Sequence, residues 1–353
     1  MRAVVVHGPR DLRVEERPDP VPGPGEVAIA VEWGGICGSD LAYFKHGASG
    51  TAKLTSPLVL GHEIAGRIAR VGTGVSGIEV GQPVTVHPAQ LVGDGVMDPR
   101  LEGRTNLYPR VRYFGSAAFD PHTDGGFAGV TLARAEQLRA LPESVDTLRG
   151  ALAEPLAVAM HAVRRAGSLA GKDILVNGAG PIGALVIAAA RHAGAQSITA
   201  ADISDASLAR AKAMGADATV NVSAAALPDD VEVVFEATGL PAVLGAVLRA
   251  TARGGTLLQV GNLPGTPAPS VLGDLVTREI TWIGSYRFID EISDAVRVMA
   301  EGLDVGPVIS HRFEAEDALA AMELAADPAA ESGKVMLHFG GPHSPAPDTA
   351  ASA

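Results

Sequence analysis

The pattern of hydrophobic and polar positions changes in character near residue 145. Up to about residue 140, short runs rich in valine and isoleucine alternate with Gly- and Pro-rich breaks. Such runs, bounded by turn residues, are typical of β-strands. We predict strands over 2–7, 12–17, 26–35, 63–72 and 82–88. The pattern favours a compact, partly open β-barrel with long loops.

After residue 145, apolar strands alternate with helical segments. We predict strands over 173–178, 197–202, 218–221, 231–239, 256–261 and 279–285, with a helix over 241–255 among those between them. This alternation predicts a doubly wound parallel sheet and hence an α/β fold. Two further helices, over 290–302 and 316–327, precede a strand over 333–339, and this end of the chain is expected to return to the first domain.

The length of 353 residues is too great for one ordinary hydrophobic core, so two domains are expected. We predict a β-rich domain from 1–154 together with 287–339, and a nucleotide-binding domain from 155–286. The last segment, 340–353, contains mainly Pro, Ala and Ser without periodicity, and we predict that it is a disordered tail.

Composition and charge narrow the partners. The chain has 28 Lys and Arg against 40 Asp and Glu, a net charge of −12, whereas a nucleic-acid binder needs a basic face. Cys37 is the single cysteine, which excludes an internal disulfide. The N-terminus lacks the apolar core of a signal peptide, and the longest apolar run, 182–190, is too short to span a bilayer. We therefore expect a cytoplasmic protein with a small-molecule substrate and with no nucleic-acid or membrane partner.

A glycine-rich turn predicts a dinucleotide site. Residues 178–183, "GAGPIG", follow an apolar strand and open a helix, with glycines in G-x-G-x-x-G spacing. Backbone N–H groups of such a turn bind a pyrophosphate at the helix N-terminus. The residues concerned are Gly178, Gly180, Pro181, Ile182 and Gly183. Asp202 ends the next strand, where it would bind ribose hydroxyls and repel a 2′-phosphate, so NAD is favoured over NADP.

Two further strand ends are candidate cofactor contacts. Thr238 and Gly239 follow the fourth strand of the parallel sheet, and Val260 and Gly261 follow the fifth. Ligands of open α/β sheets bind at the carboxyl ends of the strands. Ordinary loop packing accounts equally well for these four residues.

The candidate metal ligands come from three separate segments. Cys37 lies between glycines, where irregular and open backbone is expected, and His62 and Glu63 lie in the glycine-bounded segment "LGHEIAG". Glu154 is a carboxylate within an apolar helical stretch. Thiolate, imidazole and carboxylate are zinc ligands, and a catalytic zinc uses three of them with an open fourth position. Each residue alone could instead be structural.

Four motifs surround the candidate metal and nucleotide residues: "GGICGSDL", "GHEIAGRIARVG", "AEPLAVAMHAVRRAG" and "VNGAGPIG". Together these motifs resemble the zinc-dependent medium-chain dehydrogenases, in particular the sorbitol and L-idonate 5-dehydrogenase branch. The resemblance implies a GroES-like catalytic domain, a Rossmann domain and an active site between them. It implies that Cys37 and His62 bind one catalytic zinc, that Glu63 or Glu154 does so directly or through water, and that Ser39 takes the substrate proton.

The chain departs from that family pattern at two places. The sugar-alcohol branch usually has a histidine five positions after the zinc cysteine, where this chain has Ala42. Many members also hold a structural zinc with four cysteines in the lobe 94–108. The matching positions here are Asp94, Met97, Arg100 and Tyr108, which cannot form a thiolate site, so no structural zinc is expected.

The resemblance also supplies candidate substrate contacts. Those that could line the pocket are Tyr43, Phe114, Phe119, His122, Tyr286 and Arg287. Simple packing is the alternative for the first four, and a domain-interface salt bridge is the alternative for Arg287. Arg287 could reach a carboxylate or hydroxyl groups of the substrate, or water near the metal.

The function predicted from the sequence is hydride transfer between NAD and a secondary alcohol of a polyhydroxy compound, which could be a sugar acid, a linear polyol or a cyclic polyol. One alternative is a simple secondary-alcohol dehydrogenase, and another is a dinucleotide-binding sensor without activity. The apolar strand 279–285 at the sheet edge predicts a homodimer or homotetramer.

Overall fold

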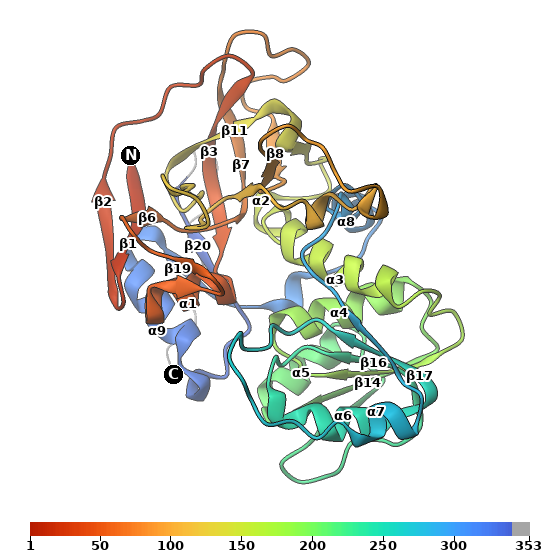
Figure 1. Cartoon of the computed structure of the whole chain (residues 1–353). Coiled ribbons are helices and arrows are strands. Elements are labelled where there is room, and N and C mark those ends of the chain that lie inside the picture. The colour runs from red at the N-terminus through yellow and green to blue at the C-terminus, as the bar shows by residue number, and fades with distance from the viewer. Residues whose placement is uncertain (341–353) are drawn as a thin grey trace.

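The computed structural model describes residues 1–340. The predicted disordered tail, 340–353, lies outside the described residues except for Gly340. Within the described part, two large β-sheets occupy separate regions of the molecule, with helix α3 (Ala153–Arg165) between them (Figure 1).

The first large sheet has seven strands among the described residues, in the order β12-β8-β7-β3-β20-β19, and β11 also pairs with β3. Their bounds are β3 (Glu26–Gly35), β7 (Glu63–Val71), β8 (Pro83–Val86), β11 (Val130–Arg134), β12 (Leu138–Ala140), β19 (Ile309–Glu314) and β20 (Lys334–His338). Alternating residues of the long strands, such as Val27, Ile29 and Val31, enter one apolar core. This alternation explains why the segment forms strands.

Smaller elements surround this sheet. The short strands are β1 (Arg2–Gly8), β2 (Asp11–Glu16) and β6 (Leu58–Val59), which pair together, β9 (Ala89–Leu91) with β10 (Val111–Tyr113), and β4 (Ala48–Ser49) with β5 (Ala52–Lys53). The helices are α1 (Gly38–His46) and α2 (Thr147–Gly150), with single turns at Pro99–Leu101, Thr105–Leu107 and Ala135–Gln137.

The second large sheet is entirely parallel, with order β15-β14-β13-β16-β17-β18. Its strands are β13 (Asp173–Asn177), β14 (Ser197–Asp202), β15 (Ala218–Asn221), β16 (Val231–Glu236), β17 (Thr251–Gln259) and β18 (Thr281–Gly284). Counted along the chain from β13, this order is 3-2-1-4-5-6, that of the doubly wound fold predicted from the sequence.

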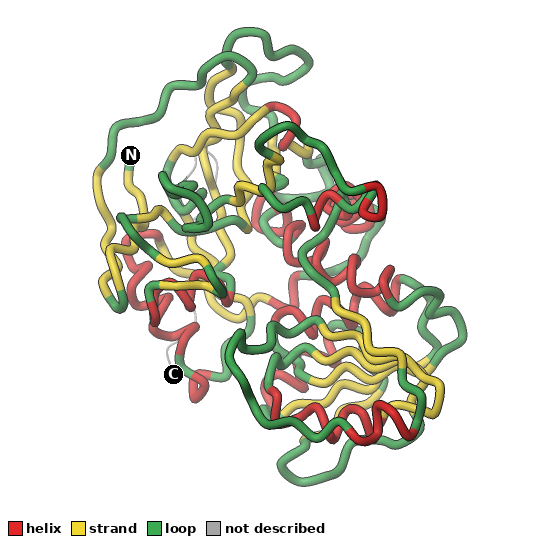
Figure 2. Tube along the Cα trace, in the orientation of Figure 1, coloured by secondary structure: helices red, strands yellow, loops and turns green. Residues whose placement is uncertain are grey.

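Helices cover both faces of this second sheet (Figure 2). They are α4 (Pro181–His192), α5 (Asp205–Ala213), α6 (Leu244–Ala250) and α7 (Gly273–Thr277), with a single turn at Pro241–Val243. Ile174 and Val176 pack in the core that contains α3 and α4, whereas Leu175 packs in the core beneath α6. Since successive strand residues point to opposite faces, a continuous apolar strand is what a sheet covered on both sides requires.

The C-terminal part of the described chain returns to the first sheet. Helices α8 (Glu291–Ala300) and α9 (Ala318–Ala326) precede β20, which pairs antiparallel with β3. Single turns lie at Gly306–Val308, Ala315–Asp317 and Pro328–Ala330. The exact domain boundaries, 1–154 with 287–339 and 155–286, stay predictions.

The predicted helix over 241–255 was too long. In the structure α6 ends at Ala250, and β17 begins at Thr251. Thr251 is β-branched and fully buried, and its Oγ1 donates to the carbonyl of Val247 at 2.7 Å. Gly254 has φ of +70°, which an α-helix cannot accommodate. Tertiary pairing with β16 therefore overrides the helical pattern.

Candidate active site

Cys37 lies where strand β3 leads into helix α1. The sequence predicted irregular backbone at this point, and Cys37 lies outside both elements, as the residue directly before the helix, with φ of −100° and ψ of 158°. Asp40 in the first turn is fully buried and accepts hydrogen bonds from the N–H of Cys37 at 2.9 Å and of Gly61 at 3.2 Å. Asp40 thus joins the cysteine segment to the segment that carries His62.

Three of the four predicted metal ligands converge. The ligand atoms of Cys37, His62 and Glu63 lie within 4.8 Å of one another, and His62 and Glu63 are buried. Burial alone would lower the pKa of His62, but the Cys37 sulfur, Asp40 and Glu154 raise it to about 10. A group of anionic donors that holds a proton on a buried imidazole is well suited to exchange that proton for a cation.

Glu63 begins strand β7 beside a buried lysine. The Lys334 Nζ donates to Glu63 Oε1 at 2.7 Å and to the carbonyl of Ile36 at 3.1 Å, and this ion pair is buried. Burial lowers the pKa of Lys334, but Glu63 and Cys37 outweigh it and raise the pKa overall. The same Nζ also lies 2.7 Å from Glu63 Oε2, so the ammonium faces both carboxylate oxygens, and a Cβ on Gly35 would lie only 2.3 Å from Oε2. A buried carboxylate beside a thiol and an imidazole is a donor set that fits zinc.

Glu154, the fourth predicted ligand, lies in the first turn of α3 and outside the convergent group. It is buried, and burial raises the pKa of its carboxyl group. The Tyr113 hydroxyl donates to Glu154 Oε1 at 2.6 Å. Burial and the adjacent Glu154 hold the pKa of Tyr113 well above its usual value, so the phenol stays protonated and donates.

Arg287 approaches this cluster from the segment after β18. Its guanidinium carbon lies 4.1 Å from the centre of the Tyr113 ring and 4.9 Å from that of Tyr286. Arg287 has φ of +51°, a left-handed conformation that costs about 1–3 kcal/mol for a non-glycine residue. A cavity of about 120 Å³ has Tyr113, Arg287 and Asn106 among its lining residues.

The other predicted substrate residues lie in diverse settings. Tyr43 and Phe114 are buried in the core of the first domain, where the Tyr43 hydroxyl accepts from the N–H of Ala117 at 3.0 Å. His122 Nε2 accepts from the N–H of Thr55 at 2.9 Å, and its Nδ1 lies 2.8 Å from the carbonyl of Phe119. Ser39 and Ala42 are half-buried on α1, and Tyr286 is 49% exposed. Their roles stay predictions.

The glycine-rich turn has the geometry of a nucleotide cradle. Gly178 has φ of +93°, and a Cβ on Gly183 would lie 1.8 Å from the Gly178 carbonyl oxygen. Gly180 directly precedes α4, whose first residues are Pro181 and Ile182, and open space surrounds the position of its absent Cβ. Asp202 lies at the end of β14 and accepts the N–H of Ala179 at 2.7 Å.

The neighbouring strand ends pack tightly at the same edge of the sheet. Glu236, fully buried, accepts from the N–H of Thr238 at 2.7 Å and of Gly239 at 3.1 Å. A Cβ on Gly261 would lie 2.2 Å from the Gly239 nitrogen, and the N–H of Val260 donates to the Glu236 carbonyl at 2.9 Å. These contacts fix both loops, and whether the loops also contact a cofactor stays a prediction.

In the lobe 94–108, a hydrogen bond joins Asp94 to Tyr108, two of the four positions that match the cysteines of the family pattern. The Tyr108 hydroxyl lies 3.2 Å from Asp94 Oδ1 as a donor and also accepts the N–H of Gly95 at 3.0 Å. Tyr108 is buried, whereas Arg100 is exposed and pairs with Asp98 at 2.9 Å. Side-chain hydrogen bonding thus links Asp94 to Tyr108, and the expected lack of a structural zinc in this lobe stays a prediction.

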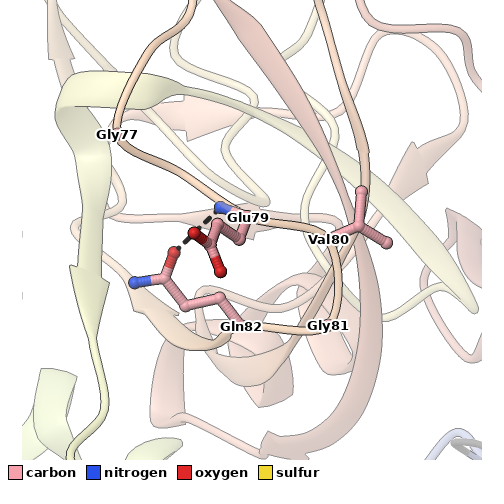
Figure 3. A pocket seen from close by; sticks show the side chains of 5 residues that line it. All are labelled: Gly77, Glu79, Val80, Gly81 and Gln82. Atoms are coloured by element: carbon pink, nitrogen blue, oxygen red, sulfur yellow. Dashed lines mark hydrogen bonds between the residues drawn. The ribbon is translucent and has the colours of Figure 1, made fainter.

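A second hollow lies on the turn between β7 and β8, and residues of that turn alone line it (Figure 3). Its lining residues are Gly77, Glu79, Val80, Gly81 and Gln82, and the N–H of Glu79 donates to Gln82 Oε1 at 3.2 Å. A surface turn with one carboxylate offers no group of convergent donors. The candidate site therefore remains the group formed by Cys37, His62 and Glu63.

Sequence reasoning did not identify Asp40, Lys334 or Tyr113. Each acts through a contact with a segment distant in the chain, for example from Lys334 to Glu63 and from Tyr113 to Glu154. One signal was available for Lys334, because a lysine at the start of the apolar strand "KVMLH" must find a buried anion or reach solvent.

The fold and the site together define a class. A parallel sheet in the 3-2-1-4-5-6 order with a glycine-rich turn is a dinucleotide-binding architecture. A second region that presents a thiol, an imidazole and a carboxylate adds a candidate metal site. The class is that of metal-dependent nicotinamide oxidoreductases.

Comparison with known proteins gives the family. Residues 23–143 match the alcohol dehydrogenase GroES-like domain, and residues 181–301 match the zinc-binding dehydrogenase domain. The chain belongs to this family of zinc-dependent alcohol and polyol dehydrogenases, as its motifs predicted.

Three relatives are similar over nearly their whole length. Sorbitol dehydrogenase of Gallus gallus is 35% identical over 95% of each chain. L-Idonate 5-dehydrogenase (NAD(P)(+)) of Escherichia coli K12 is 34% identical over 96% of this chain and 98% of its own, and its crystal structure superposes with a TM-score of 0.89. A Sinorhizobium meliloti 1021 protein solved with NADP bound is 30% identical over 96% of this chain and 99% of its own, with a TM-score of 0.85. Zinc and a nicotinamide cofactor are therefore the groups that this family uses.

No helix among the described residues is long and apolar enough to cross a membrane.

Proposed function

We propose that this protein oxidises a secondary alcohol of a polyhydroxy compound with NAD and one zinc ion bound by Cys37, His62 and Glu63. The observation that carries the proposal is the convergence of these three donors within 4.8 Å. Sorbitol and L-idonate dehydrogenases among the relatives support a polyol or sugar-acid substrate.

Each residue of the candidate site has a definite role in this proposal. Bound zinc and NAD supply a Lewis acid that acidifies the alcohol and a hydride acceptor. Cys37, His62 and Glu63 hold the metal, while Lys334 balances the charge of Glu63. Ser39, half-buried in the first turn of α1, takes the hydroxyl proton of the substrate and passes it to water, since Ala42 cannot extend the relay.

Arg287 is the proposed recognition group for the substrate. A guanidinium binds a carboxylate or vicinal hydroxyls through several parallel hydrogen bonds. The Arg287 guanidinium lies over the ring of Tyr113, the residue that bonds to Glu154, so a positive charge lies beside the candidate site. Tyr286, next to Arg287 in the chain, is 49% exposed and offers a phenol. This arrangement favours a polar substrate with hydroxyl or carboxylate groups beyond the reacting carbon.

NAD is the proposed cofactor rather than NADP. Asp202 ends β14, as the acidic residue of NAD-binding sheets does, and a carboxylate repels a 2′-phosphate. A small assembly, a homodimer or homotetramer, is proposed because β18 forms an edge of the parallel sheet.

A simple secondary-alcohol dehydrogenase is the second candidate. The methyl group of Ala42 makes the site less polar than a histidine there would. A non-catalytic sensor has less support, because a sensor would not require the convergent donors Cys37, His62 and Glu63 that this chain has.

A substrate screen tests the proposal. Zinc-loaded protein is assayed for NADH formation with polyols, aldonates and simple secondary alcohols. We expect the highest kcat/KM for a polyol or an aldonate. A preference for unsubstituted alcohols would support the second candidate, and inactivity with all three classes would contradict both enzyme functions.

A further inference from the structure

Tyr113 occupies a central place between the metal donors and the cavity. It ends strand β10, is 6% exposed, and packs edge-on against His62 with ring centres 5.5 Å apart. Its hydroxyl donates to Glu154, and one ring face carries Arg287. One side chain therefore contacts a metal donor, a second carboxylate and the proposed recognition arginine.

The hydrogen bond to Glu154 separates the two carboxylates of the site. Glu63 lies in the group with Cys37 and His62 and is paired with Lys334, whereas Glu154 lies outside that group and its Oε1 accepts the phenol hydrogen bond at 2.6 Å. A short bond from a neutral donor to a carboxylate is among the stronger hydrogen bonds. It fixes the orientation of Glu154 in a buried site.

We propose that Tyr113 is a positioning residue that keeps Glu154 out of the metal's coordination shell, so that Glu63 is the carboxylate ligand. If the Tyr113 hydroxyl were removed, the buried Glu154 carboxylate would lose its hydrogen-bond donor. It would then turn to the strongest cation nearby, which is the metal. The open coordination position would then be lost to Glu154 and no longer be free for substrate. This inference rests on the proposed function, since it presumes a metal at Cys37.

The same residue ties this arrangement to substrate binding. Tyr113 belongs to the β9–β10 ribbon, and its ring is the surface on which the Arg287 guanidinium rests. Phenylalanine at this position would keep the ring and the stacking but remove the hydroxyl. The Tyr113→Phe substitution therefore separates the two contacts.

The test uses protein loaded with Co²⁺, whose visible absorption reports the ligands of the metal. Tyr113→Phe is compared with the wild type and with Tyr108→Phe, a matched control in which another buried tyrosine loses a hydroxyl bonded to a carboxylate. We expect Tyr113→Phe to change the cobalt bands and Tyr108→Phe to leave them unchanged. We also expect Tyr113→Phe to have no effect on the bands in a Glu154→Gln background.

Kinetics provide a second reading on zinc-loaded protein. We expect kcat/KM of Tyr113→Phe to fall about tenfold to a hundredfold, the range for one hydrogen bond to a charged group, mainly through kcat. KM should change little because Arg287 retains its stacking surface.

Specific outcomes overturn the inference. They are a cobalt spectrum of Tyr113→Phe identical to that of the wild type, or a spectral change that persists when Glu154 is Gln. If Tyr113→Phe does not fold, Glu154→Gln alone provides the test. Replacing a metal ligand by an amide changes the cobalt bands, so bands that change in Glu154→Gln would overturn the inference, and unchanged bands would support it. The spectra need no substrate, so an inactive wild type would refute the proposed function and leave this inference testable.

Discussion

Asp202 is the residue on which the proposed preference for NAD depends. Its Oδ2 accepts the N–H of Ala179 in the glycine-rich turn, and its Oδ1 accepts the N–H of Ser204 at 3.0 Å. The carboxylate is thus held in place by backbone bonds while each oxygen keeps a second lone pair for ribose.

We predict that Asp202→Ala narrows the preference for NAD over NADP, because the charge that repels a 2′-phosphate is removed. The ratio of kcat/KM for the two cofactors measures the effect, and we expect a reduction of at least about tenfold, equivalent to about 1.4 kcal/mol. Asp229→Ala, on an exposed turn before β16, controls for the change in net charge. A wild type that prefers NADP would contradict the role given to Asp202.

Single residues show how far the sequence predicted the site. Cys37, His62 and Glu63 were identifiable because their chemistry is unusual for their positions. Tyr113 and Lys334 were not, since a tyrosine or a lysine has many ordinary roles and only the fold places them at Glu154 and Glu63. Glu154 was identified as a carboxylate at the metal, but its distance from the other three donors depends on packing that no local pattern encodes.

The contact between helices α3 and α8 contains a buried charged cluster. Glu291 Oε1 lies 3.0 Å from His161 Nδ1 and 3.2 Å from an Arg164 nitrogen, and Glu291 is 2% exposed. Burial alone would raise the pKa of Glu291, but hydrogen bonds from His161 and from the N–H of Ile289 lower it to about 2. The folded protein therefore binds the proton less readily than the unfolded chain does.

Glu291→Gln should destabilise the fold at neutral pH by up to about 3 kcal/mol, the equivalent of the pKa shift. A depressed carboxyl pKa contributes stability above the unfolded value near 4.5, and this contribution is lost as the pH falls towards 2. The difference between variant and wild type, followed by urea unfolding, should therefore be constant from pH 7 to about pH 5 and shrink below. Glu301→Gln, an exposed i,i+4 pair with Arg297, is the control and should cost about 0.3–0.5 kcal/mol. A difference that grows on acidification would contradict this account.

The lobe 94–108 should hold no metal. Asp94 and Tyr108 bond to each other, Arg100 brings a positive charge, and Met97 is a poor ligand for zinc. Elemental analysis of dialysed protein should give one zinc per chain, and Cys37→Ala combined with His62→Ala should bring it near zero. Two zinc ions in the wild type, or zinc retained in the double variant, would show that the lobe binds metal.

Elements of the parallel sheet were predictable to a greater degree than those of the first domain. Strands β13 and β16 each contain successive buried apolar residues, at 174–176 and 233–235, and each is followed by a turn that contains glycine, so their pattern is unambiguous. At 241–255 the pattern failed, because the pairing of Thr251 with Val231 of the neighbouring strand determines where α6 ends. Long-range pairing of this kind also places β20 beside β3, which no local periodicity specifies.

At the scale of the whole molecule, the edge strand β18 predicts self-association. It is terminal in the parallel sheet, and exposed apolar side chains precede it at Val271 and Val276, which are 66% and 76% exposed. Unpaired strand edges require cover, and two-fold pairing of identical edges provides it. Light scattering at micromolar concentration should report a dimer or tetramer. A pure monomer would contradict the prediction.

The molecule places the metal donors in one domain and the nucleotide turn in the other, with α3 carrying Glu154 between them. In the proposed function neither half is sufficient for hydride transfer, because the metal would hold the alcohol while its carbon faces the nicotinamide. Activity should therefore depend on the metal at Cys37 even when the fold and nucleotide binding are intact.

The most direct test is the initial rate of NADH formation, with the best substrate of the screen, as zinc is returned to metal-stripped protein. We predict that the rate rises in proportion to bound zinc and levels off at one zinc per chain, and that Cys37→Ala stays at background while it still binds NADH. Full wild-type turnover after verified removal of all metal would contradict the account.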